Sequence, residues 1–170
     1  GYKVIYMTNT IIETLVEGES TESDHLLGEA YFVRAWMHLN LVTLYARPYS
    51  HGVDNLGIPL HVSTNNAVVT RAKVGDVYAQ IVKDLTKASE LMGASRGNKG
   101  YPSKETALGI LSRVYLYMEN WQECVNTVNT MLGGASAASK LDADLANLYI
   151  NAKTSSEVLF CLAHETIGDD

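Results

Sequence analysis

Apolar residues recur every three to four positions in several stretches of the chain, and this spacing is typical of amphipathic α-helices. Polar or glycine-rich segments separate these stretches. Ser23 or Asp24 and, further on, Ser103 are suitable N-caps for the helices that follow them. Gly133, which comes after the last stretch, is typical of a helix C-terminus. We therefore predict helices over residues 1–16, 25–46, 74–92, 103–119 and 121–132.

The predicted helix at residues 25–46 is apolar on nearly every side. Aromatic side chains such as Phe32 and Trp36 widen its apolar stripe far beyond a single face. A helix of this kind needs cover from two or more neighbours, so we expect it at the centre of the fold. Pro48 ends the helical pattern. Residues 47–70, with two prolines and two glycines, are expected to form a long irregular loop.

The C-terminal part of the sequence departs from this spacing. Residues 141–150 predict a short helix, and Glu157–Glu165 carries an unbroken apolar run that is typical of a buried strand. A buried strand needs neighbours for its backbone hydrogen bonds, and the sequence offers few other strands. We therefore expect the chain to be a fragment of a longer protein.

Composition narrows the classes of function. The chain has 170 residues, enough for one domain, and a net charge of −6 with scattered Lys and Arg argues against a nucleic-acid partner. No apolar run has the length of a membrane span, and two cysteines are too few for a disulfide framework. Sequence motifs such as the Walker loop and G-x-S-x-G do not occur, so we expect neither an enzyme nor a cofactor.

Histidine and cysteine form no convincing metal or catalytic set. His51 and His61 are ten residues apart in irregular chain, and the sequence has no pair of histidines with the helical spacing of metal ligands. Cys161 and His164 would face opposite sides of a strand, so a thiol–imidazole pair is not expected. We therefore expect no bound metal.

The helical pattern also contains a repeat. Residues 104–132 place large, small and aromatic side chains where a tetratricopeptide repeat requires them. "LVTLY", which begins at Leu41, is echoed 70 residues later by "LSRVY", about two repeat lengths away. The sequence thus predicts a mainly α fold, a tetratricopeptide-like helical repeat array, with a short strand near the C-terminus. Trp36 and Trp121 fall on the apolar stripes and are expected in the core.

A longer segment, "GEAYFVRAWMHLNLVTLYARPY" followed by "LGIPL", closely resembles the signature of SusD/RagB-type nutrient-binding lipoproteins. In that family an E-A-x-F-x-R-A helix leads through L-Y to a loop that ends in G-x-P-L. Three further segments match in family order: "RAKVGDVYAQIVKDLTKASELM", "KETALGILSRVYLYMENWQEC" and "SSEVLFCL". "ARPYS" is closer to the RagB-like branch, and Ala46 departs from the glycine that many members have there.

The resemblance implies that residues 1–170 are the N-terminal helical domain of a SusD-like protein, a fragment with an inserted loop at about residues 47–70. It also implies an outer-membrane lipoprotein at the cell surface of Bacteroidetes, whose lipid anchor is not in this chain. Such a protein would bind an oligosaccharide or a peptide and pass it to a SusC-like TonB-dependent transporter. The residues alone leave a second function open, a tetratricopeptide-like scaffold that binds proteins and no small ligand.

The loop after the central helix holds the candidate ligand-binding or docking residues Tyr49, His51, Asp54 and Asn55. None of them is needed for an apolar stripe, and together they offer a ring for stacking and polar groups for a sugar or peptide. The alternative is that this loop packs on another part of the protein or on the transporter. Arg34, in contrast, is expected to fasten its helix to a neighbouring segment, because a buried charge is seldom left unpaired.

Overall fold

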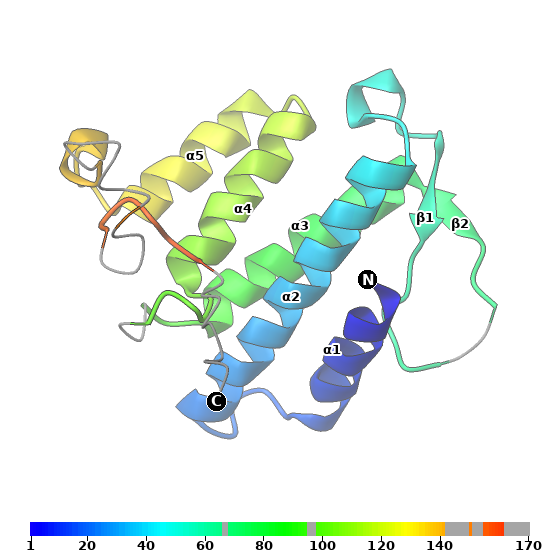
Figure 1. Cartoon of the computed structure of the whole chain (residues 1–170), viewed down its shortest axis with the longest axis horizontal. Helices are drawn as coiled ribbons and strands as arrows, with labels where there is room; N and C mark the ends of the chain where they lie inside the picture. Colours follow the sequence, from blue (N-terminus) through cyan, green and yellow to red (C-terminus); the bar gives the residue numbers. More distant parts are fainter. Residues whose placement is uncertain (66–67, 95–97, 142–149, 151–154, 162–170) are drawn as a thin grey trace, which may run out of the picture.

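The computed structural model describes residues 1–65, 68–94, 98–141, 150 and 155–161, and this part of the protein is mainly helical (Figure 1). The helices predicted between residues 1 and 132 are all confirmed, with bounds that differ by a few residues. The short helix predicted at 141–150 falls on residues 142–149, which lie outside the described part. The helices are α1 (Tyr2–Thr14), α2 (Thr21–Tyr45), α3 (Val74–Leu91), α4 (Lys104–Tyr117) and α5 (Trp121–Leu132).

Local capping explains where the helices begin. Ser20 caps α2, because its hydroxyl accepts a hydrogen bond from the Ser23 amide at 3.1 Å. The prediction of Ser23 or Asp24 as this cap was wrong: α2 begins earlier, and the Asp24 carboxylate instead accepts from the amide of Gly18 at 2.7 Å. The predicted cap of α4 is confirmed, since Ser103 forms a capping box at its start.

Helix α2 lies between α1 and α3, and the array continues with α4 packed on α3 and α5 packed on α4 (Figure 1). One core runs through these layers. It joins Phe32 and Val42 of α2 to Ile81 and Leu85 of α3 and to Val114 of α4, all of them fully or almost fully buried. The prediction that residues 25–46 form a central helix with cover on two sides is therefore confirmed.

Trp36 packs against this core from α2 and is half-buried. Its ring lies 5.8 Å from the ring of Phe32 and 5.4 Å from that of Phe160, measured between centroids. The C-terminal segment 155–161 thus returns to the central helix and covers its aromatic side.

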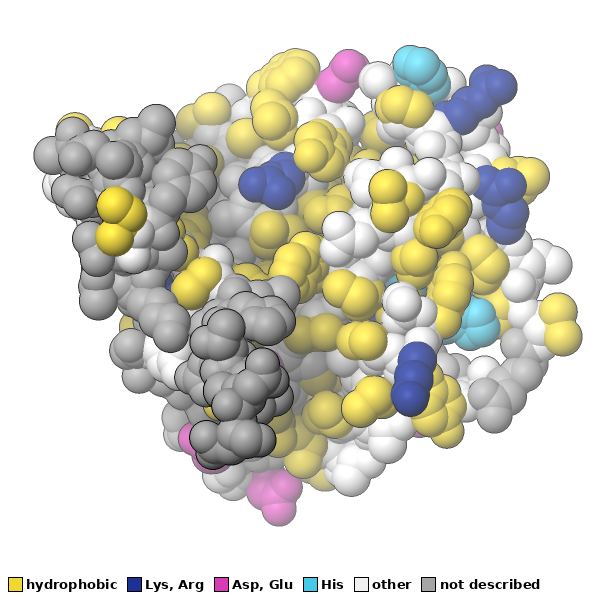
Figure 2. Space-filling model, viewed as in Figure 1, with side chains coloured by type: hydrophobic (Ala, Val, Ile, Leu, Met, Phe, Trp, Pro, Cys, Tyr) yellow, Lys and Arg dark blue, Asp and Glu magenta, His cyan; other side chains and the backbone are white. Residues whose placement is uncertain are grey.

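Large apolar side chains remain exposed on the outer face of the first two helices. They include Val4 and Met7 of α1 and Leu44 and Tyr45 of α2, and Figure 2 shows many apolar side chains over these helices. Apolar surface of this kind is typical of a face that contacts another protein or domain. Among the described residues, no helix combines the length and the apolar character needed to cross a membrane.

The connection between α2 and α3 is more regular than predicted. After a 3₁₀ turn (Tyr49–His51), strand β1 (Leu56–Pro59) pairs antiparallel with β2 (Arg71–Lys73). The pairing closes the loop at its base. Strands of 4 and 3 residues are too short to show an alternating pattern in the sequence, and Pro59 argues against a strand there.

The strand predicted at Glu157–Glu165 is not present in its described part, residues 157–161, which run as irregular and half-buried chain. Side chains and one loop carbonyl take the place of a neighbouring strand. Lys99 Nζ donates to the carbonyl of Val158 at 2.5 Å, and the Thr106 hydroxyl donates to that of Leu159 at 3.2 Å. The Cys161 amide donates to the carbonyl of Lys99 at 2.9 Å. Residues 162–165 lie outside the described part.

Candidate functional site

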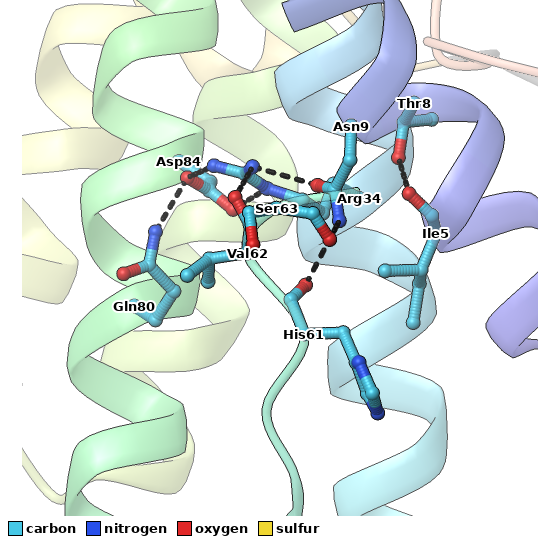
Figure 3. A network of polar contacts seen from close by, with 9 residues as sticks. All are labelled: Ile5, Thr8, Asn9, Arg34, His61, Val62, Ser63, Gln80 and Asp84. Carbon is cyan, nitrogen blue, oxygen red and sulfur yellow. Dashed lines mark hydrogen bonds and ion pairs between the residues drawn. The ribbon is translucent and has the colours of Figure 1, made fainter. Parts of the chain in front are cut away.

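A buried ion pair holds the central helix in place (Figure 3). Arg34 Nε donates to Asp84 Oδ2 at 2.8 Å, and Nη2 donates to Oδ1 at 2.7 Å, so α2 is fastened to α3. Arg34 Nη1 also donates to Asn9 Oδ1 at 2.9 Å and to the carbonyl of Val62 at 3.2 Å. Gln80 donates to Asp84 at 2.8 Å from within α3. The prediction that Arg34 fastens its helix to a neighbouring segment is confirmed.

Side chains of helix α1 form hydrogen bonds with the backbone of the second half of the loop (Figure 3). The Tyr2 hydroxyl donates to the carbonyl of Pro59 at 3.1 Å, and Asn9 Nδ2 donates to that of Ser63 at 2.9 Å. At the far end, the Glu13 carboxylate accepts from the Thr64 amide at 2.8 Å. Hydrogen bonds from Thr64 hold the pKa of Glu13 below its ordinary value. These contacts fix residues 59–64 against the helical array.

His38 lies on the same buried side of α2. Its ring is 0% exposed, and neither ring nitrogen has a hydrogen-bond partner within the described part of the chain. The pKa of His38 is lowered to about 4, chiefly by burial and to a smaller extent by the positive charges of Arg34 and His61. The ring is therefore a neutral core group near pH 7 rather than a proton donor for chemistry.

The structure does not gather the predicted loop residues into one constellation. Tyr49 is half-buried, and its ring meets that of Tyr78 edge to face at 5.0 Å. Asn55 Nδ2 closes the turn by donating to the carbonyls of His51 and Gly52, each at 2.9 Å. His51 itself is exposed. Of these four residues Tyr49 lines a hollow shared with α3, α4 and α5, and half-buried Asn55 lines a separate hollow beside the C-terminal end of α2.

Asp54 is occupied by a surface ion pair. Its carboxylate accepts from Lys73 Nζ at 2.7 Å, across the base of the loop. That hydrogen bond and the charge of Lys73 hold the pKa of Asp54 below its ordinary value. Both side chains are exposed, so the pair helps to position the loop without building an enclosed site.

A groove lies between the C-terminal end of α2, the 3₁₀ turn and the connection from α4 to α5. Its volume is about 360 Å³. Four aromatic residues line it, together with one cation, one acid and several small residues; we call it the aromatic groove. Its rings and charged groups are Tyr49, Tyr78, Tyr117, Trp121, Arg47 and Glu119.

The prediction that Trp121 lies in the core was wrong. This residue was expected in the core of a tetratricopeptide pair, whereas its side chain is 59% exposed at the mouth of the aromatic groove. Trp121 is the first residue of α5 and follows the turn at Glu119, so α4 has already ended where the ring projects. The predicted packing of α4 against α5 is confirmed, but the buried aromatic position that the repeat pattern assigns to Trp121 is not. The closeness of the aromatic residue to the turn "MEN" was the signal that could have revealed its exposure.

Glu119 turns the chain at the edge of this groove. It has a left-handed backbone conformation with φ of 58°, which non-glycine residues adopt at a cost. The turn it makes lets the Asn120 amide donate to the carbonyl of Tyr115 at 2.9 Å, which closes the C-terminus of α4. The strained turn sets the direction in which α5 and its Trp121 ring leave α4.

No metal centre is found within the described residues, where no three His, Cys, Asp or Glu side chains form a group that could hold an ion. His61 packs its ring against Tyr2 at 5.3 Å between centroids, away from His51. Cys161 is a half-buried free thiol, and His164, its partner in the discarded thiol–imidazole pair, lies outside the described part.

Comparisons with known proteins agree with this fold. Residues 1–116 match the SusD-like family model described as "Starch-binding associating with outer membrane". SusD-like protein P2 of Formosa agariphila is 25% identical over 167 residues, which cover 95% of this chain and 32% of that protein. A SusD superfamily protein of known structure from Bacteroides fragilis has a TM-score of 0.82 at 25% identity, over 96% of this chain and 39% of that one.

A second solved structure is that of a protein described as carbohydrate binding. It is a SusD-like carbohydrate binding protein from Bacteroides vulgatus, with a TM-score of 0.75 at 25% identity, over 86% of this chain and 32% of that one. The chain thus spans about a third of the length of the relatives it matches. Because the family match extends over residues 1–116 of 170, more than half of the sequence, this chain belongs to the SusD-like family.

Proposed function

We propose that the chain is part of a non-catalytic protein that binds a glycan for uptake, and that the aromatic groove is one wall of the glycan site. The observation that carries this proposal is that two aromatic side chains lining the groove are accessible to a ligand: Tyr117 is 43% exposed and Trp121 is 59% exposed. Aromatic faces stack on the apolar faces of sugar rings, and Arg47, Glu119 and Ser50 can exchange hydrogen bonds with sugar hydroxyls.

A glycan is favoured over a peptide as the ligand. The Bacteroides vulgatus relative is described as carbohydrate binding, and the groove offers more ring surface than charge. Of the loop residues predicted to bind, we propose that Tyr49 contacts the ligand directly. His51 and Asp54 are exposed on the same loop, where docking to another part of the protein or to a partner suits them better, whereas half-buried Asn55 lines a neighbouring hollow beside Arg47.

The same proposal places the protein in the outer membrane, lipid-anchored at the cell surface, where it passes the oligosaccharide to a SusC-like TonB-dependent transporter. The family description, which names association with the outer membrane, supports the location. The exposed apolar side chains of α1 and α2 suit contact with a partner protein. Co-purification of a TonB-dependent barrel with this protein from solubilised membranes tests the partnership, and its consistent absence would contradict it.

Fluorescence of Trp121 tests the glycan site directly. The chain has 2 tryptophans, so a Trp36→Phe variant leaves Trp121 as the sole reporter in a panel of neutral and acidic oligosaccharides. We expect a shift in emission and millimolar affinity, because one wall with a few solvent-competed contacts yields little net binding free energy. A protein of the relatives' full length should bind the same glycan more tightly, since pockets between domains have two walls.

A matched pair of variants separates this site from unspecific contact. Tyr117→Ala removes a groove ring, whereas Tyr101→Ala removes a ring that is 52% exposed on a loop outside the groove. We expect only the first to weaken glycan binding. If neither variant changes the affinity for the glycan, the binding site lies elsewhere. A chain that binds proteins but no glycan would support the tetratricopeptide-like scaffold instead.

A further inference from the structure

The aromatic groove continues into a second hollow. This hollow has a volume of about 420 Å³ and shares Ala46 and Arg47 with the groove, so the two meet at the C-terminal end of α2. Tyr45 and Leu56, 69% and 60% exposed, give it apolar surface, and Arg71 closes it on the side of the sheet. A ligand longer than one sugar ring could therefore lie across Arg47 and touch both hollows.

Within the residues that the structure describes, Arg71 has no carboxylate partner. Its Nε donates to the carbonyl of Gly57 at 2.6 Å, and its Nη2 donates to those of Leu56 at 2.9 Å and Tyr45 at 3.3 Å. All three acceptors are neutral carbonyls. They fix the direction of the guanidinium while leaving it a full positive charge that is exposed beside the hollow.

Arg47 is exposed, and within the described part of the chain it has no carboxylate partner. The residues that line the two hollows include two arginines, Arg47 and Arg71, but one acid, Glu119, which lines the aromatic groove. The chain as a whole has a net charge of −6, so the positive charge at this end of α2 is opposite in sign to the net charge of the chain. Two unpaired guanidiniums beside open rings suit a ligand that is both cyclic and negatively charged.

We propose that the two hollows together bind an anionic oligosaccharide, whose carboxylate or sulfate groups contact Arg47 and Arg71 while its sugar rings stack on Trp121 and Tyr45. This proposal rests on the proposed glycan-binding function and names the class of glycan. Arg47 can pair with carboxylate and with sulfate oxygens through two parallel N–H donors, and Arg71, whose Nε and Nη2 donate to carbonyls, keeps Nη1 for the same kinds of oxygen. The arrangement therefore serves uronic-acid and sulfated sugars alike. The ordinary alternative, two solvated surface arginines, predicts no preference for charge.

Titration of the Trp36→Phe chain with three oligosaccharides of equal length tests the proposal: an oligogalacturonide, a sulfated oligosaccharide and a neutral laminari-oligosaccharide. At low ionic strength at least one of the two acidic ligands should bind about tenfold more tightly than the neutral one, and the difference should shrink in about 0.5 M salt. Preference for the first or the second acidic ligand identifies the anion. Equal or weaker affinity for both acidic ligands would overturn the inference.

Charge-removing variants locate the effect. Arg47→Gln should weaken binding of the acidic ligand about fivefold, the usual loss for one exposed ion pair, and weaken the neutral ligand clearly less, because there only hydrogen bonds to sugar hydroxyls are affected. Arg113→Gln removes the same charge from an exposed position on α4 outside both hollows, and should change neither affinity. Arg71→Lys keeps the charge but loses the fixed donors, and should reduce the preference without unfolding the loop. Equal effects of Arg47→Gln and Arg113→Gln would also overturn the inference.

Two further outcomes separate this inference from the proposed function. Binding of the neutral ligand with no preference for charge leaves the glycan site in place and removes only its anionic character. Failure of all three ligands to change Trp121 emission contradicts the proposed site itself. Inorganic sulfate that displaces the acidic oligosaccharide at the oligosaccharide's own concentration would reduce the site to an ion-binding site and refute the glycan.

Discussion

Replacing Asp84 with alanine should lower the free energy of unfolding by about 4 kcal/mol. The change removes two charge-assisted hydrogen bonds from Arg34, at 2.8 and 2.7 Å, each worth roughly 1.5–3 kcal/mol. Arg34 is only 4% exposed, so water cannot replace the lost acceptors. Its remaining contacts, to Asn9 and the carbonyl of Val62, persist and keep the loss near the usual range of about 3–5 kcal/mol for breaking a buried pair.

Urea denaturation followed by circular dichroism measures this loss. The control is Lys73→Ala, which breaks the ion pair with Asp54, also at 2.7 Å but with both side chains more than half exposed, and should leave the midpoint unchanged. An Arg34→Met, Asp84→Leu double variant should recover much of the stability, because no buried charge is left alone. If Asp84→Ala costs no more than Lys73→Ala, water reaches Arg34 and the account of a sealed network is wrong.

Three further changes probe other parts of the fold. Trp36→Ala should lower the free energy of unfolding by about 3 kcal/mol, the low end for this substitution, because the ring is half-buried. His51→Ala should change it by no more than about 0.5 kcal/mol, because His51 is exposed. Equal losses of the two variants in thermal denaturation would contradict the described core. The His38 ring stays neutral in the folded protein down to about pH 4 but takes up a proton near pH 6.5 when unfolded. Stability should therefore be complete above pH 6.5 and fall by about 3 kcal/mol as the pH drops to 4, and a His38→Phe variant that shows the same fall would refute this origin. Glu119→Gly should raise the melting temperature, because glycine adopts a φ of 58° without strain; a lower melting temperature would mean that the carboxylate contributes more than the strain costs.

Features set by local spacing were predictable from the sequence. The periodicity of α3, the Ser103 cap and the stop of α5 at Gly133, whose φ is 58°, depend on residues within one or two turns. Arg34 was also predictable as a fastening residue, because a charge in an apolar helix needs a partner. The identity of that partner was not, since Asp84 lies 50 residues away and is joined only by the fold.

Features set by tertiary context were missed. The run at Glu157–Glu165 has the composition of a strand, but side chains such as Lys99 and Thr106 satisfy its carbonyls instead of a neighbouring strand. Trp121 shares the spacing of core residues, yet it projects beyond the end of its partner helix. The candidate site was therefore only partly foreseen: Tyr49 lines the groove, whereas two of its other rings, Tyr117 at the end of α4 and Trp121 at the start of α5, come more than 60 residues later.

Helix α1 holds residues 59–64 chiefly through their main chain, since carbonyls of Pro59, His61 and Ser63 accept from Tyr2 and Asn9. Every residue type supplies the same carbonyl, so these hydrogen bonds do not depend on which side chains the segment carries. Substitutions can accumulate in this segment without loosening these main-chain contacts, although the His61 ring and the Thr64 hydroxyl add side-chain contacts to Tyr2 and Glu13. The surface of this segment can therefore change one residue at a time while the scaffold beneath it keeps its shape.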